Sequence, residues 1–202
     1  MSLTIDTAEA PEKSGASMLR LRTLVRLRWL AVIGQSVAVV IVAVVLGYPM
    51  PLGPCFAMIA LSAWLNIFLT IRWHGSLRLS PRMAGLLLAY DTAQLAALLY
   101  LTGGLQNPCA FLFLVPVTVS ATSLPLRSTL ALGALSFGCA TALAFYHLPL
   151  PWPPSEPLQL HTYYLAGLWI AIVCGTVFSA IYARRIAEEA RQMSAALGAT
   201  EL

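Results

Sequence analysis

Six long apolar stretches dominate this sequence and restrict what it can fold into. Each is close to the roughly 20 residues that an α-helix needs to cross the hydrocarbon core of a bilayer. They occupy residues 29–48, 53–71, 83–102, 108–124, 128–146 and 162–183, of which the fourth stretch is the shortest. Only 10% of the 202 residues are charged, whereas 59% are hydrophobic. The sequence therefore predicts an all-α polytopic membrane protein, a bundle of six transmembrane helices.

The arginines predict how these helices are oriented, because cytoplasmic connections are enriched in Lys and Arg. Arginines precede the first stretch and then occur at every second connection, as Arg20, Arg22, Arg26, Arg28, Arg72, Arg78, Arg82, Arg127, Arg184 and Arg185. The three alternate connections hold no Lys or Arg. We therefore expect both the N- and C-termini in the cytoplasm. Because the basic residues mark helix ends and form no continuous stripe, we expect no nucleic-acid partner.

The two ends of the chain differ from the apolar middle. Residues 1–17 are polar without an apolar period and predict a disordered cytoplasmic tail, and residues 18–183 form the transmembrane domain. Residues 184–202 are polar but helical, with a seam of Ile186, Ala190, Met193 and Leu197. This spacing indicates the start of a cytoplasmic coiled-coil linker that would pair two copies in parallel, or else a short amphipathic surface helix. No helix stop signal precedes Leu202, so we expect the chain to be a piece of a longer protein.

Asp91 is the charged residue placed well inside a predicted span. A carboxylate at that depth is costly and marks a candidate functional site. Gln94 lies on the same helical face, which should point into the bundle. We expect Asp91 to be neutral at pH 7, and a purely structural role, hydrogen-bonded to Gln35 or Asn66 on a neighbouring span, is equally compatible with the sequence.

The segment LTGGLQNPCAF predicts that one helix stops and the next begins. Gly103 and Gly104 suit the left-handed residue that ends a helix, and Asn107 followed by Pro108 suits the start of the next one. The first amides of that helix, on Cys109 and its two successors, would lack intrahelical acceptors and could bind a small carbonyl ligand. A tight helical hairpin without a ligand explains the same residues and is favoured on local pattern alone.

Motifs for catalysis and metal binding are missing from the sequence. Cys55, Cys109, Cys139 and Cys174 are scattered singly, and no pair of histidines lies within the spans. We therefore expect no metal or haem site and no catalytic residues in this chain. A small-solute transporter or channel and an intramembrane enzyme are the competing classes. The first should show repeats or paired broken helices and the second a nucleophile with histidine, and the sequence has neither.

The run YDTAQLAALLYLTGGLQNPCAFLFLVP resembles the third and fourth spans of the RegB/PrrB/ActS type of redox-sensing histidine kinase, which carries a GGxxNPF motif. RLRTLVRLRWLAVIGQ and YARRIAEEARQMSAALGATEL resemble the first span and the exit helix of that family. The resemblance covers about residues 18–202. Gly103, Gly104, Asn107 and Pro108 match the motif, whereas Cys109 stands where the family has phenylalanine.

This resemblance implies a redox sensor domain in the bacterial inner membrane that binds ubiquinone and controls a cytoplasmic, ATP-dependent kinase. The implied quinone-binding residues are Gly103, Gly104, Leu105, Gln106, Asn107, Pro108, Cys109 and Phe111. The implied partners are membrane lipid, a second copy of the chain and a cognate response regulator. The phosphoacceptor histidine and the ATP-binding glycine motif of such kinases do not occur in these 202 residues.

Overall fold

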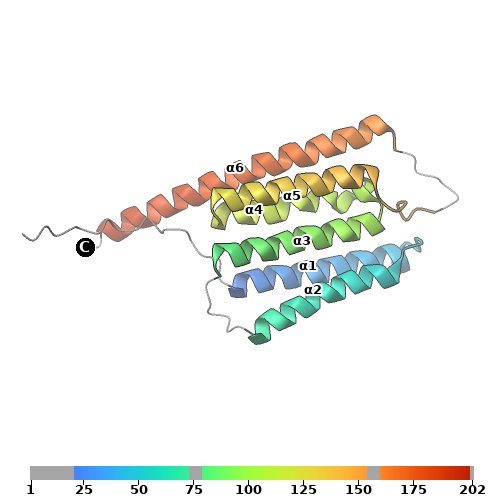
Figure 1. The fold of residues 1–202 in the computed structure, drawn as a ribbon, viewed down its shortest axis with the longest axis horizontal. Helices are drawn as coiled ribbons and strands as arrows, with labels where there is room; N and C mark the ends of the chain where they lie inside the picture. The colour runs from blue at the N-terminus through green and yellow to red at the C-terminus, as the bar shows by residue number, and fades with distance from the viewer. Residues whose placement is uncertain (1–20, 73–78, 154–159, 201–202) are drawn as a thin grey trace, which may run out of the picture.

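The computed structural model describes residues 21–72, 79–153 and 160–200, and these form a bundle of roughly parallel and antiparallel helices (Figure 1). The helices run back and forth between the two ends of the bundle, as the colour gradient in Figure 1 shows. In chain order they are α1 (Leu21–Val40), η1 (Ile41–Val45), α2 (Leu52–Arg72), α3 (Pro81–Leu101), η2 (Gly104–Gln106), η3 (Pro108–Phe113), α4 (Leu114–Ser123), α5 (Leu126–Phe145) and α6 (Thr162–Thr200). The prediction of an all-α polytopic bundle is confirmed.

Five of the described helical segments are long and apolar enough to cross a membrane, and the fourth span is built differently. It consists of η3, a 3-10 helix of six residues, followed directly by α4, with ten. A 3-10 helix rises about 2.0 Å per residue, so η3 and α4 together cover about 27 Å. The 3-10 start thus lets a short apolar segment approach the hydrocarbon thickness of about 30 Å.

The arginines gather at one end of the bundle. Described arginines lie near the starts of α1, α3 and α5 and at the end of α2, and these helix ends are at the left in Figure 1. This is the end that the positive-inside rule places in the cytoplasm. Arg184 and Arg185 lie within α6, just after the last apolar stretch. Arg20, Arg78 and the predicted tail of residues 1–17 lie outside the described residues.

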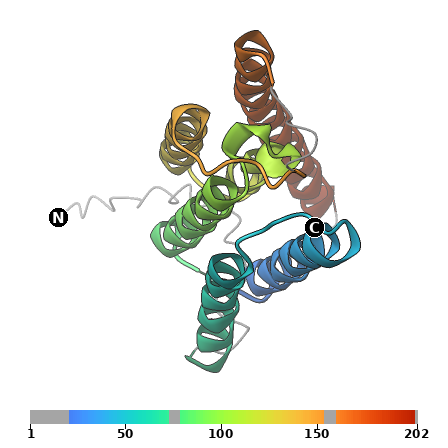
Figure 2. The ribbon, with the colours of Figure 1, turned by 90° about the vertical axis from the view of Figure 1, so that its right-hand side faces the viewer.

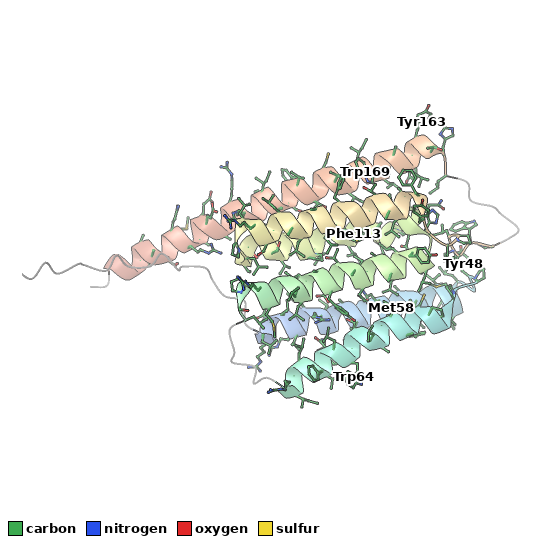
Figure 3. All side chains as sticks on the ribbon, in the orientation of Figure 1. Tyr48, Met58, Trp64, Phe113, Tyr163 and Trp169 are labelled. Carbon is green, nitrogen blue, oxygen red and sulfur yellow. The ribbon has the colours of Figure 1, made fainter. Side chains whose placement is uncertain are left out.

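The opposite, outer end carries aromatic residues and a proline-rich connection. Tyr48 and Tyr163 lie at this end in Figure 3, where membrane proteins place their interfacial aromatic rings. The described part of the connection, residues 146–153, is not helical and lies over the outer ends of the helices. Its Leu148 amide donates to the Tyr100 carbonyl at 2.8 Å, and the Trp152 ring lies 5.3 Å from the Tyr48 ring. These two contacts hold the described part of the connection against the outer ends of the helices.

Packing divides the bundle into α1 and α2 on one side, α4, α5 and α6 on the other, and α3 between them (Figure 2). An inner apolar cluster that includes Leu24, Leu69 and Leu88 joins the cytoplasmic halves of the helices. An outer cluster forms around Phe113, which is completely buried. Large apolar side chains on the outside, such as Leu30 and Leu86, are exposed and suit contact with lipid.

Helix α6 is much longer than a membrane span. Its 39 residues extend about 58 Å at 1.5 Å per residue, so its C-terminal part projects beyond the bundle at the arginine-rich end (Figure 1). The helix continues through residue 184, where we expected the transmembrane domain to give way to the linker. Thr118 donates to the Ser179 hydroxyl at 3.1 Å, which links α4 to α6.

Candidate functional site

The helix stop and restart predicted from LTGGLQNPCAF is present in the structure. Helix α3 ends at Leu101, and Gly103 follows in the left-handed region with φ of 106°. The Asn107 side chain accepts a hydrogen bond from the Cys109 amide at 2.8 Å, and Pro108 takes the first helical position. The predicted N-cap is confirmed. The new helix begins as the 3-10 helix η3 and becomes α-helical at Leu114.

Gly103 and Gly104 lack a side chain where other residues of the same chain pack closely. A Cβ atom on Gly103 would lie 2.9 Å from the Leu150 Cα atom, and one on Gly104 would lie 2.6 Å from the Leu143 carbonyl oxygen. Both glycines are buried, and so is Leu105, at 2% exposure. The space beside each glycine is therefore filled by α5 and the outer connection.

The first two amides of η3 and the Asn107 side chain have hydrogen-bond partners within the chain. The Cys109 amide is taken by Asn107, and the Ala110 amide donates to the Asn107 carbonyl at 3.0 Å. The Asn107 side-chain nitrogen donates to the Thr102 hydroxyl at 2.8 Å. The expectation that the Cys109 and Ala110 amides lack acceptors is therefore corrected. Asn107 ties the end of α3 to the start of η3.

An apolar cavity of about 310 Å³, which we call the outer cavity, lies beside this turn. Its walls come from α1, α3, η3 and the outer connection. Of the residues implied by the family motif, it is lined by Asn107, Pro108 and Cys109. Phe111 is not among the lining residues and is 59% exposed on the outside of the bundle. Gly103, Gly104, Leu105 and Gln106 likewise do not line this cavity.

Several residues lining the outer cavity carry no local sequence signal. They include Gly34, Ala38, Tyr48, Leu99, Thr102, Leu112 and Trp152. Gln35 also lines the cavity, and it was recognisable as a polar residue inside an apolar stretch. The others are ordinary apolar, small or aromatic residues, and the fold brings them together from segments far apart in the chain.

Two glutamines, the half-buried Gln35 and the buried Gln94, join α1 to α3 at the inner edge of the outer cavity. Gln94 donates to the Gln35 side-chain oxygen at 3.0 Å, and Gln35 donates back to Gln94 at 3.3 Å. Gln94 is 5% exposed, which confirms that its helical face points into the bundle. A primary amide has two N–H donors and a carbonyl with two lone pairs, so each glutamine keeps one donor for a further partner.

Asp91 forms an ion pair that the sequence did not reveal. The Arg28 Nε atom lies 3.0 Å from the Asp91 carboxylate, and the Arg28 side chain is 3% exposed. The expected partners are wrong: Gln35 pairs with Gln94, and Asn66 donates to the Val25 carbonyl at 3.1 Å. The Arg28 guanidinium is a counter-charge that the expectation of a neutral carboxyl did not take into account, and it leads us to predict a charged Asp91 instead. Arg28, counted above only as a topology signal, belongs to the buried interior.

Comparison with known proteins places the chain in a family. Residues 16–195 match the model of the PilS-like transmembrane domain, a domain of six transmembrane helices. The chain belongs to this family. Its residues also align with the sensor histidine kinase RegB of Cereibacter sphaeroides, at 43% identity over 183 residues. A second RegB sequence, from a named strain of that species, is 44% identical over 184 residues. No solved structure matches the chain.

These alignments confirm the resemblance to the RegB type of sensor domain. Each covers 91% of this chain but only 40% of the relative, so the chain spans less than half the length of the RegB proteins it matches. The chain is a multi-pass protein of the bacterial inner membrane. In the described part of the chain, no three His, Cys, Asp or Glu side chains gather to hold a metal ion.

Proposed function

We propose that this chain is the signal-input domain of a two-component histidine kinase and that it binds the head of a ubiquinone in the outer cavity. The observation that carries the proposal is the position of this cavity, which is bordered by Asn107, Pro108 and Cys109 of the family motif. Its volume of about 310 Å³ falls at the lower end of the range of small-molecule sites. The kinase and its response regulator would belong to the rest of the longer protein and its pathway.

The lining of the outer cavity matches the chemistry of a quinone. A quinone has an apolar ring and two carbonyl oxygens that accept hydrogen bonds. Gln35 has one N–H group beyond the one given to Gln94, so it can donate to a carbonyl without breaking the glutamine pair. Tyr48 and Trp152 close the outer side with aromatic surface. Cys109 is smaller than the phenylalanine of the family motif and leaves more of the cavity open.

The outer cavity is connected through η3 and α4 to α6, the helix that leaves the membrane. Leu112 of η3 lines the cavity, and Leu114, two residues further on in α4, packs on α6, 3.3 Å from where a Cβ atom on Gly175 would lie. Thr118 then hydrogen-bonds to Ser179 of α6. A ligand that displaces η3 would therefore move the surface on which α6 rests. We propose that the effect of a ligand bound in the outer cavity reaches the cytoplasmic end of α6 through these contacts.

Quinone binding is tested by filling the outer cavity and by tryptophan quenching. Ala38→Phe places a ring in the cavity, and we expect it to weaken the binding of a short-tailed ubiquinone at least about tenfold, or roughly 1.4 kcal/mol. Quenching of tryptophan fluorescence in detergent reports the binding. Trp152→Phe should remove most of the saturable quenching, because Trp152 lines the cavity.

Trp64→Phe is the matched control for the reporter, because Trp64 is 70% exposed on α2 and does not line the cavity. It should keep the saturable quenching of the wild type. Equal quinone affinity in the wild type and in Ala38→Phe would refute a site in the outer cavity.

We further propose that two copies of the chain pair in parallel through the projecting part of α6. Ile186 and Met193 of the predicted seam are 47% and 68% exposed, an unfavourable arrangement for apolar residues outside the membrane. Pairing of the two seams would bury them in a coiled coil.

Cysteine cross-linking tests this pairing in a Cys174→Ala background, because Cys174 is itself exposed on α6. Met193→Cys should form a disulfide between two chains in native membranes. Gln192→Cys, one position away and off the seam, is the control and should cross-link far less. A stronger cross-link from Gln192→Cys would show that another face of α6 forms the contact.

A further inference from the structure

A second set of polar groups lies closer to the cytoplasm than the outer cavity and is incompletely paired. The Arg28 guanidinium contacts Asp91 through Nε and lies 5.2 Å from the centre of the Tyr90 ring. Among the described residues, none of the three guanidinium nitrogens of Arg28, Nε included, has a hydrogen-bond acceptor, although all three are buried. Unpaired donors are costly in the middle of a membrane, where water is scarce. They mark a place where an acceptor is missing.

A second cavity, which we call the inner cavity, adjoins this ion pair. Its volume is about 380 Å³, and Arg28, Asp91 and Gln94 are among its lining residues. The remaining walls are mainly apolar side chains of α1, α3 and α4. Leu30 and Val115 on its rim are 68% and 52% exposed on the lipid-facing surface, so the inner cavity opens sideways towards the bilayer. A ligand would enter from the membrane.

The two cavities share a wall. Gly34, Gln35, Leu95 and Leu112 line both of them. Ala31 lines only the inner cavity and Ala38 only the outer one, seven residues apart on the same face of α1. Each cavity can therefore be blocked separately by a substitution of the same kind.

The charges of the inner cavity select its ligand. Arg28 and Asp91 neutralise one another, so an anionic ligand would leave a net negative charge in a low-dielectric site. A neutral carbonyl oxygen can accept from the free Nη–H groups without adding charge. The apolar walls and the sideways opening require the rest of the ligand to be apolar. To reach a ligand, the buried Nη groups would have to turn towards the cavity that Arg28 lines.

We propose that the inner cavity is a second quinone site, in which Arg28 donates to a quinone carbonyl and Gln94 borders the ring. This inference takes the class of ligand from the proposed function but not the site. One chain would then hold two quinone heads, on either side of the glutamine pair of Gln35 and Gln94.

Counting bound quinone tests the proposal. The purified chain is placed in nanodiscs of ether-linked phospholipid, which contain no carbonyl groups, and titrated with a ubiquinone that has a single isoprene unit. Binding is measured above that of empty discs. We expect two quinones per wild-type chain, one for Ala31→Phe, one for Ala38→Phe and none for the double variant. Arg28→Lys keeps the charge opposite Asp91 but lacks the guanidinium fork, and it should bind one.

Different quinone counts would refute the inner site and the outer site. One quinone per wild-type chain, unchanged by Ala31→Phe, would overturn the inner site and leave the outer one intact. Unchanged binding in Ala38→Phe together with a loss in Ala31→Phe would overturn the outer site instead. If ester-linked discs reduced the wild-type count from two to one, a lipid carbonyl would be the natural occupant of the inner cavity, and the second quinone would be refuted.

Discussion

Asp91→Asn is expected to lower the free energy of unfolding by about 3 to 5 kcal/mol, because it leaves a buried guanidinium without its counter-charge. Arg28 is 3% exposed and has no other charged partner among the described residues. The amide that replaces the carboxylate can accept a hydrogen bond but supplies no negative charge. Unfolding in SDS or thermal melting in mild detergent, followed by circular dichroism, measures the loss.

Removal of both charges is the control for this prediction. Arg28→Met combined with Asp91→Leu replaces the ion pair by apolar side chains, a change that is often neutral or stabilising in other proteins. We expect this double variant to be much closer to the wild type than Asp91→Asn is. A normally stable Asp91→Asn protein would mean that Asp91 is neutral, as its sequence position alone suggested, and that the ion pair contributes little.

Gly104→Ala is expected to lower the free energy of unfolding by about 2 to 4 kcal/mol, which combines left-handed strain with overpacking. Gly104 has a φ of 58°, and an added Cβ would lie 2.6 Å from the Leu143 carbonyl and 2.7 Å from the His147 ring. The turn and the end of α5 would have to separate. The same melting measurements report the effect.

Gly47→Ala separates the cost of the left-handed backbone from the cost of overpacking. Gly47 has a φ of 68°, but no atom lies within 4 Å of the position of its Cβ. It should therefore show only the cost of the left-handed backbone, about 1 to 2 kcal/mol. If Gly104→Ala were no more destabilising than Gly47→Ala but bound quinone more weakly, Gly104 would serve ligand approach after all, contrary to the packing described here.

Local chemistry made much of the architecture predictable from the sequence. The six apolar stretches correspond to six helical spans, since a chain in lipid must satisfy its backbone hydrogen bonds internally. The N-cap at Asn107 was predictable for the same reason, because a cap involves only residues within a few positions of one another. Even here the 3-10 geometry of η3 was not evident, because it depends on how far the fourth span must reach.

The candidate site depended on contacts between distant segments. Gln35 and Gln94 are 59 residues apart, and Arg28 reaches Asp91 from a different helix. On sequence grounds Arg28 was one of several arginines before the first span, and Phe111 was a ring close to the motif. Only the tertiary structure decided that Arg28 turns inwards and Phe111 outwards, because the direction of a side chain depends on which helices pack beside it. The sequence by itself determined the spans and the helix break, which follow from hydrophobicity and local hydrogen bonding. The cavities and the ion pair lie between α1 and α3, and they depend on how the tertiary structure places these two helices.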